Sequence, residues 1–539
     1  MSRDRAEAAS ALTTGNRTTR ALGLLLALGV AACFAWHVAH YYFVSDDAYI
    51  SFRYSLNLVE GHGLVYNPGE RVEGYSNFLW VLMAAATIAL GLAPEIPANA
   101  LGIASGATIL LSLVALSRRG SGWLHPLVWV APACLAANRT FTAWSTGALA
   151  TQFFAALVLL ALLAYLAERR SSASRPAVSA LLFAAAALTR PEGPLFFAIA
   201  AAFFAADVFV LGRRRVGSLA MWLTLFALVV GTHVAWRWSY YGYPLPNTYY
   251  AKVAGFWWES SRVWMGLFVT DHHIAWVAPL PLLGLLLRRD HTAALLATTV
   301  ATYTAYLLYI GGDFFEYRLT TPILPLWYWL AQEGIREVAR RLRRILPGGL
   351  ILALGLLGGA ALVFTAHAPT RHGFDAGGHK ISSLEGYRQF TDSRVEQGKF
   401  LASLVDQGIL RGDEVLCVRG AGALPYFSRL PTLDYHGLTD AFVAHQPTLE
   451  RGWVAHEKRA PREYIEQRGA VIWDVENRIV RPPGARQPRP HRVRTAFYEG
   501  PVCCVKAADR YLVFATTLTQ DAFREAFERC EVVFYRRRP

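Results

Sequence analysis

Charged residues are scarce in this chain of 539 residues. They make up 17% of the sequence, whereas 54% is hydrophobic and the mean hydropathy is +0.27. A soluble domain carries about a quarter charged residues. The composition therefore excludes an ordinary soluble protein and favours a membrane protein.

Acidic residues are also fewer than basic ones, 39 against 53, which gives a formal net charge of +14. The basic residues stand in short runs between apolar segments: Arg118-Arg119, Glu168-Arg169-Arg170, Arg213-Arg214-Arg215, Arg288-Arg289 and Arg340-Arg341. This placement is typical of the cytoplasmic loops of membrane proteins. It does not indicate a nucleic-acid surface, so no nucleic-acid partner is expected.

Cysteine is rare, with six residues and no repeated spacing. That scarcity argues against a structural zinc site and against a dense disulfide framework. One disulfide could form in an exported C-terminal region, among Cys417, Cys503, Cys504 and Cys530. The spacing does not decide which of them would pair.

Long hydrophobic runs dominate the first two thirds of the chain. Because a spanning helix needs roughly 20 apolar residues, about eleven spans are expected, near residues 21–43, 97–117, 123–138, 148–167, 176–190, 192–211, 217–238, 273–287, 292–311, 319–334 and 348–367. We read residues 21–43 as an uncleaved first helix with a cytoplasmic N-terminus. The arginine runs then all fall on the cytoplasmic side.

The predicted organisation is a transmembrane module over residues 1–370 and a soluble extracytoplasmic α/β domain over residues 371–539. The first outer loop covers about 44–96 and includes Asn77–Leu90 as a juxtamembrane or re-entrant helix. In the outer domain the pattern predicts helices at 394–407 and 462–468 and strands at 414–418, 470–473, 511–516 and 531–535. The location expected for such a chain is a bacterial inner membrane.

Two adjacent carboxylates, Asp46 and Asp47, open the first outer loop. Ionisable groups this close to a bilayer are functional more often than structural. They could act as a general base or as ligands of a divalent cation, Mg²⁺ or Mn²⁺. The alternative is that they cap the helix predicted over residues 48–59.

Cations and further polar residues are expected on the same outer face. Arg53, Arg190, Lys252 and Arg318 are candidates for binding a phosphate group; each could instead be a residue whose charge reaches the membrane interface. Candidates for substrate contact are Glu73, Tyr75, Asn247, Tyr249, Tyr250 and Asp313. For the tyrosines the alternative is an aromatic belt, and for Asp313 it is a helix cap.

Four segments resemble the GT-C superfamily of polytopic membrane glycosyltransferases. They are DDAYISFRYSLNLVEGHGLVYNPGERVEGYSNFLW, LTRPEG, YGYPLPNTYYAKV and GGDFFEYRLTTPILP. The nearest likeness is to the terminal arabinofuranosyltransferases of mycobacteria and corynebacteria, which the outer segments GAGALPYFSRLPTLDYHGLTDAFVA and HEKRAPREYI also resemble. One departure is Ala150 in TGALAT, where relatives often have Glu.

The resemblance implies transfer of a sugar, arabinofuranose or another pentose or hexose. The donor would be a polyprenyl-phosphate sugar and the acceptor a cell-envelope glycan or glycolipid, with an acidic residue of the first outer loop as base or metal ligand. Asp46 and Asp47 match that motif. A transporter, or a non-enzymatic scaffold for the envelope or for motility, is the alternative from another class.

Overall fold

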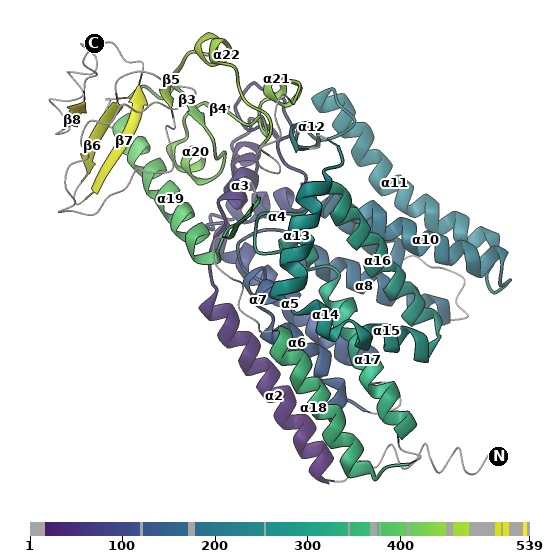
Figure 1. The fold of residues 1–539 in the computed structure, drawn as a ribbon. Helices are drawn as coiled ribbons and strands as arrows, with labels where there is room; N and C mark the ends of the chain where they lie inside the picture. Colours follow the sequence, from purple (N-terminus) through teal and green to yellow (C-terminus); the bar gives the residue numbers. More distant parts are fainter. Residues whose placement is uncertain are drawn as a thin grey trace.

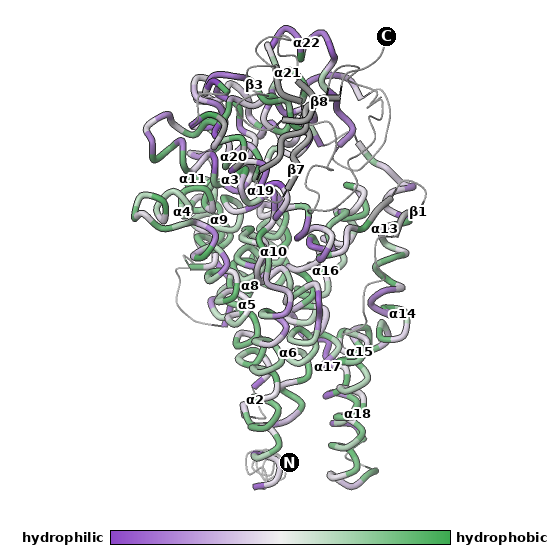
Figure 2. The backbone as a smooth tube through the Cα atoms, turned by 90° about the vertical axis from the view of Figure 1, so that its left-hand side faces the viewer, coloured by the Kyte–Doolittle hydropathy of each residue, from purple (hydrophilic) through white to green (hydrophobic). Residues whose placement is uncertain are grey.

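The computed structural model describes residues 17–118, 122–170, 178–252, 255–342, 345–366, 374–376, 379–406, 410–448, 456–473, 502–507, 510–516 and 532–535. Within these residues, six helices are long and apolar enough to cross a membrane: α2 (Arg17–His40), α5 (Glu95–Ser117), α8 (Thr151–Arg170), α11 (Val216–Tyr241), α16 (His291–Ile310) and α18 (Gly348–Ala366). They form one elongated bundle (Figure 1). Figure 2 shows hydrophobic residues through most of this bundle and hydrophilic ones around α22 and β3.

Helices that are shorter or less apolar complete the bundle. They are α6 (Val130–Ala137), α7 (Arg139–Ala143), α9 (Val178–Thr189), α10 (Gly193–Phe209), α13 (Trp258–Asp271), α14 (Ile274–Val277), α15 (Pro279–Arg288) and α17 (Leu324–Leu342). Each expected span therefore contains a helix, but two of these segments are interrupted. In the span expected at 123–138 the 3₁₀ turn η1 (Pro126–Val128) precedes α6, and in the span expected at 273–287 Pro279 begins a new helix because it has no N–H to continue the old one.

Close backbone contact holds α15 against α17. A Cβ atom added at Gly284 would lie 2.1 Å from the carbonyl oxygen of Leu330, and one added at Gly334 would lie 2.1 Å from that of Leu280. Only glycine fits at either position. Small residues at helix crossings are how membrane helices gain packing without a hydrophobic driving force.

The first outer loop contains two short helices, α3 (Asp46–Val59) and α4 (Phe78–Ala89). α3 begins two residues before the expected residue 48, so both aspartates lie in its first turn and Ser45 occupies the N-cap position. α4 has 12 residues, about 18 Å of helix, and is too short to span a bilayer. This length fits the predicted juxtamembrane helix.

An α/β unit lies at one end of the bundle (Figure 1). Its helices are α19 (Leu384–Asp406), α20 (Ala423–Ser428), α21 (Ala441–Ala444) and α22 (Arg462–Gln467), and its main strands are β3 (Val415–Val418), β4 (Thr432–Asp434), β5 (Ala470–Trp473), β6 (Val502–Ala507), β7 (Arg510–Thr516) and β8 (Val532–Tyr535). The sheet order is β4-β3-β5-β7-β6-β8, with β3 parallel to β4 and β5 and the other pairs antiparallel. The predicted strands are all present. α19 begins ten residues before the predicted residue 394.

A small two-stranded sheet, β1 (Phe374–Ala376) with β2 (His379–Ile381), precedes α19. Residue Ser382, just after β2, forms an isolated bridge with Phe315. The remaining short elements, α12 (Asn247–Lys252) and the 3₁₀ turn η2 (Arg318–Thr320), carry predicted site residues. The polar motifs of the chain are thereby gathered where the bundle meets the α/β unit.

Candidate active site

Asp46 faces the α/β unit. Its Oδ1 atom accepts a hydrogen bond from the backbone N–H of Ala423 at 2.8 Å, and the residue is only 4% exposed. A Cβ added at Gly422 would lie 2.3 Å from Asp46 Oδ2, so that position requires glycine. The carboxylate of Asp46 is therefore held by a hydrogen bond at the first residue of α20.

Asp47, its neighbour, faces the helical bundle. Its Oδ2 atom lies 3.4 Å from Nη1 of Arg318, and its side chain remains 30% exposed. Nε of the same arginine lies 3.3 Å from Oδ2 of Asp313, which is almost fully buried. We call Asp47, Asp313 and Arg318 the Asp47 cluster. In it one guanidinium connects two carboxylates that are 266 residues apart in sequence, the difference between 313 and 47.

The segment that carries Asp313 and Arg318 has a strained backbone. Glu316 and Tyr317 are non-glycine residues with φ of 28° and 53°, a region that costs of order 1 kcal/mol or more per residue. Side-chain contacts hold the segment in place: Arg139 lies 3.2 Å from Glu316, and the Tyr317 hydroxyl donates to Asp271 at 2.6 Å. Strain retained in this way is common at functional sites.

Aromatic rings support the guanidinium of Arg318. Its Cζ atom lies 4.7 Å from the centroid of Phe315 and 5.5 Å from that of Trp144. Such contacts fix the plane of the group while leaving its edge available to an anion.

Two further predicted cations lie close to the Asp47 cluster. The charges of Asp47, Arg318, Asp313 and Arg190 all act on the ammonium of Lys252, whose side chain is exposed at the end of α12. Arg190 is paired with Glu192 at 2.8 Å, and this glutamate also feels the charge of Arg318. The structure thus brings together three of the four cations that the sequence predicted.

Arg53 does not belong to this group. Its nitrogens donate to the carbonyl oxygens of Tyr66, Leu430 and Pro425 at 2.8, 2.9 and 2.5 Å, and to Asn67 Oδ1 at 3.4 Å. The guanidinium is buried and lies 4.6 Å from the Tyr66 ring centroid. These contacts occupy its donors and attach the first outer loop to the α/β unit.

Two amides attach the same unit. Asn67 accepts from the N–H of Thr432 at 3.0 Å and donates to its carbonyl at 2.8 Å. Asn247 donates to the carbonyls of Gly437 and Leu438 at 2.8 and 3.0 Å. We call the hydrogen bonds of Asp46, Arg53, Asn67 and Asn247 to residues 423–440 the docking contacts. No sequence pattern pointed to them, because backbone acceptors carry no side-chain signature.

Glu73 and Tyr75 lie in a separate buried polar group. Glu73 is paired with Arg237 of α11 at 2.7 Å, and the Tyr75 hydroxyl lies 3.1 Å from that of Tyr241. Burial raises the pKa of Glu73 to about 7, although Arg237 opposes the shift. This group does not include a member of the Asp47 cluster.

The predicted tyrosines form an aromatic surface with residues that the sequence did not single out. Tyr250 and Tyr243 both stack on His445, with centroids 4.5 and 4.8 Å away, and Tyr249 packs edge-on against Tyr250 at 5.6 Å. Tyr243, Tyr249 and His445 are exposed. The surface therefore joins α12 to α21 at the outer end of the protein.

The donor set does not suit a divalent cation. Asp46 and Asp47 take different partners, and the Arg318 guanidinium already lies between Asp47 and Asp313. No group of three His, Cys, Asp or Glu side chains in the described part of the chain could hold a metal ion. We derive no step through the Mg²⁺ or Mn²⁺ that the sequence left open.

The fold of this chain is similar to that of solved structures. ArnT from Cupriavidus metallidurans bound to undecaprenyl phosphate matches with a TM-score of 0.55 at 12% identity, over 92% of this chain and 98% of that one. The apo state of the same ArnT matches at 13% identity over 76% of this chain and 85% of that one, with a TM-score of 0.49. The first of these likenesses confirms the predicted fold class, a polytopic α-helical membrane protein with an α/β domain, as an ArnT-like fold.

Sequence comparisons match a smaller part of the chain than the structural comparison does. A family model described as "Domain of unknown function (DUF8728)" matches residues 387–521, most of the α/β unit. No curated protein matches the chain. The likeness to the terminal arabinofuranosyltransferases therefore stays a prediction.

Proposed function

We propose that this protein is a GT-C-type glycosyltransferase that uses a polyprenyl-phosphate sugar as donor. The observation that carries the proposal is the Asp47 cluster, in which a partly exposed carboxylate lies beside cations suited to a phosphate. The fold supports it, because the ArnT structure with that fold was solved with undecaprenyl phosphate bound.

In the proposed reaction Asp47 is the general base. A hydroxyl oxygen of the acceptor attacks the anomeric carbon of the donor sugar, the bond from that carbon to the phosphate oxygen breaks, and the hydroxyl proton passes to Asp47. The products are a new glycoside and polyprenyl phosphate. Asp47 suits this role better than Asp46, because Asp46 is buried against Ala423.

Arg318 and Lys252 would hold the phosphate of the donor. Arg318 pairs with Asp47, and the charges of Asp47, Arg318 and Arg190 all influence the ammonium of Lys252. Guanidinium groups form paired hydrogen bonds with phosphate oxygens and stabilise the negative charge that develops on the leaving group. The polyprenyl chain would lie along the apolar bundle.

The aromatic surface around His445 would hold the acceptor, a cell-envelope glycan or glycolipid. Exposed tyrosine rings at the outer end of the protein suit the apolar faces of sugar rings, and the docking contacts fix α21 relative to α12. In this arrangement the N-terminus is cytoplasmic, the α/β domain is extracytoplasmic, and the protein lies in a bacterial inner membrane. The transferred sugar is arabinofuranose or another pentose or hexose.

A deletion strain tests the proposal. Mass spectrometry of its envelope glycans and prenyl-linked sugars should find a donor lipid that accumulates and a terminal sugar that is missing. Wild-type protein should restore the glycan and Asp47→Asn should not. Unchanged glycans and lipids in the deletion strain would refute the proposal.

A further inference from the structure

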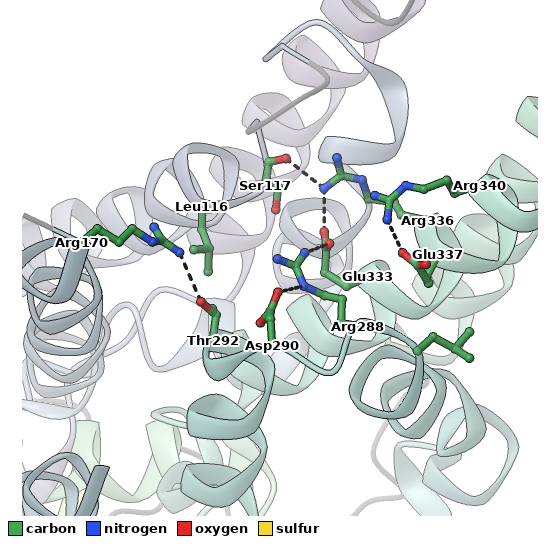
Figure 3. Close-up of a pocket in the computed structure, with 11 residues that line it drawn as sticks. Leu116, Ser117, Arg170, Arg288, Asp290, Thr292, Glu333, Arg336, Glu337 and Arg340 are labelled. Carbon is green, nitrogen blue, oxygen red and sulfur yellow. Dashed lines mark hydrogen bonds and ion pairs between the residues drawn. The ribbon is translucent and has the colours of Figure 1, made fainter. Parts of the chain in front are cut away.

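A cavity lined largely by charged residues lies at the other end of the bundle. Between the ends of α5, α8 and α15, the start of α16 and one face of α17 is a cavity of about 250 Å³ (Figure 3). α16 has 20 residues, about 30 Å of helix. It begins at this cavity and ends beside the segment that carries Asp313 and Arg318. The cavity is therefore remote from the Asp47 cluster.

Arginine dominates the lining. Four arginines and three carboxylates line the cavity: Arg170, Arg288, Arg336, Arg340, Asp290, Glu333 and Glu337. A second cation, Arg341, lies 3.8 Å from Glu337 and shares that carboxylate with Arg340. Arg341 lies outside the lining; within the lining four guanidinium groups face three carboxylates, which leaves an excess of one positive charge.

The deeper part of the lining is an ion-pair network. Arg336 donates to Glu333 at 2.6 Å and to the carbonyl of Ser117 at 2.9 Å, while Arg288 pairs with Glu333 and with Asp290 at 2.7 Å. Arg336 and Glu333 are buried. These residues neutralise one another and shape the cavity, so they are not the source of its excess charge.

The rim supplies that charge. Arg170, at the end of α8, donates to the neutral hydroxyl of Thr292 at 3.3 Å, and Arg340 is exposed and shares its carboxylate partner (Figure 3). A guanidinium whose partner is a neutral hydroxyl gains more from an added anion than one already paired with a carboxylate. Arg170 and Arg340 are therefore the groups from which an anion would gain most.

We propose that this cavity binds a phosphate group, carried by an anionic membrane lipid or present as the free ion. Guanidinium groups match phosphate oxygens in pairs, and a cavity of about 250 Å³ holds a group several times larger than a water molecule, which takes about 30 Å³. Basic pockets between membrane helices commonly take lipid headgroups. The exposed Leu282 and Leu286 lead along α15 to the cavity and suit the acyl chains of a lipid. This inference does not rest on the proposed transferase activity.

Two assays on the purified full chain distinguish the two sources. Native mass spectrometry measures retention of phosphatidylglycerol against phosphatidylcholine from mixed nanodiscs. A melting-temperature assay compares sodium phosphate with sodium chloride at equal ionic strength. Retained phosphatidylglycerol identifies a lipid headgroup, whereas stabilisation by phosphate without lipid retention identifies the free ion.

The variant is Arg170→Gln/Arg340→Gln, which should bind the retained ligand about tenfold more weakly, the loss of roughly one charge-assisted hydrogen bond. The matched control, Arg215→Gln/Arg289→Gln, removes the same charge from exposed arginines outside the lining and should bind like the wild type. If the double variant unfolds, Arg170→Gln alone replaces it. Equal behaviour of wild type and variant in both assays, or an equal loss in the control, would overturn the proposal.

Discussion

The docking contacts and the Asp47 cluster each include one of the two aspartates in the first turn of α3, and their partners differ. Asp46, Arg53 and Asn247 bind backbone groups of residues 423–440 at 2.5–3.3 Å. In the Asp47 cluster charged side chains pair with one another at 3.3–3.4 Å, and the side chain of Asp47 is still 30% exposed. The side chains of the first arrangement are held by backbone groups, whereas the second keeps a partly exposed carboxylate that a ligand can reach.

This difference separates a structural role from a functional one among residues that look alike in sequence. A buried ionic group bound to backbone acceptors cannot turn to a substrate without leaving those acceptors unsatisfied, at a cost of about 1–3 kcal/mol each. The Asp47 cluster bears no such cost. Variants on the two sides should therefore change different properties. Three of them can sharpen or break the comparison, and a fourth test concerns the separate buried group of Glu73.

The largest effect is expected for Asp47→Asn. Loss of a general base lowers the rate of transfer by about 10²–10⁴-fold, while the melting temperature should stay near that of the wild type because the side chain is partly exposed. The measurement is transfer of labelled sugar from a polyprenyl-phosphate donor by purified protein. Transfer at the wild-type rate would remove Asp47 from the mechanism.

Arg318→Gln should be nearly as severe. It removes the guanidinium that connects Asp47 and Asp313 and that would stabilise the leaving phosphate, so a fall of about 10²–10³-fold is expected. Arg318→Lys keeps the charge but not the paired donors, so its rate of transfer should lie between that of the wild type and that of Arg318→Gln. If Arg318→Lys lost as much activity as Arg318→Gln, geometry rather than charge would be the essential property.

Asp46→Ala tests the docking side. It leaves the buried N–H of Ala423 without its acceptor, which should destabilise the protein by about 1–3 kcal/mol. The folded fraction should still catalyse transfer, so activity per folded molecule is the decisive readout. Asp46→Asn, whose amide oxygen can accept the same hydrogen bond, serves as the control. A stable but inactive Asp46→Asn would break the comparison.

The smallest effect is a pH dependence of stability at Glu73. Burial raises its pKa to about 7 in the folded protein, above the value near 4.3 of an unperturbed glutamate. The folded state therefore binds more protons than the unfolded state between these values, and stability falls as pH rises from about 4 to 7. Melting temperatures across this range should fall for the wild type more than for Glu73→Gln. Parallel curves for the two proteins would show that Glu73 titrates alike in both states.

Much of the architecture could be predicted from local sequence. The apolar runs located the helices, and period-two patterns located the strands β3, β5, β7 and β8. Breaks within the spans were not predicted, because hydropathy averages over a window and does not register a single capping side chain. His125, which accepts from the N–H of Leu127 at 3.3 Å and begins η1 within the span expected at 123–138, is one example.

The candidate site could be predicted in part. Counting the spans, which cross the membrane in alternating directions, needs only the sequence. It placed four residues on one face: Asp47, Lys252, Asp313 and Arg318. The roles of Asp46, Arg53 and Asn247 did not follow, since their partners are backbone groups up to 377 residues away in the chain. His445 and Arg237 were missed for the same reason, because each matters only through a distant contact.

The sequence by itself determined the class of structure. Membrane insertion depends on the apolar content of each segment, and the sidedness of polar motifs depends on counting spans, so both are properties of local composition. Only the tertiary structure decided which aspartate is buried in a hydrogen bond with the backbone and which stays partly exposed to a substrate. Asp46 and Asp47 share the same chemistry and the same helix turn, and successive helical residues point about 100° apart. One therefore meets the N–H of Ala423 and the other meets Arg318.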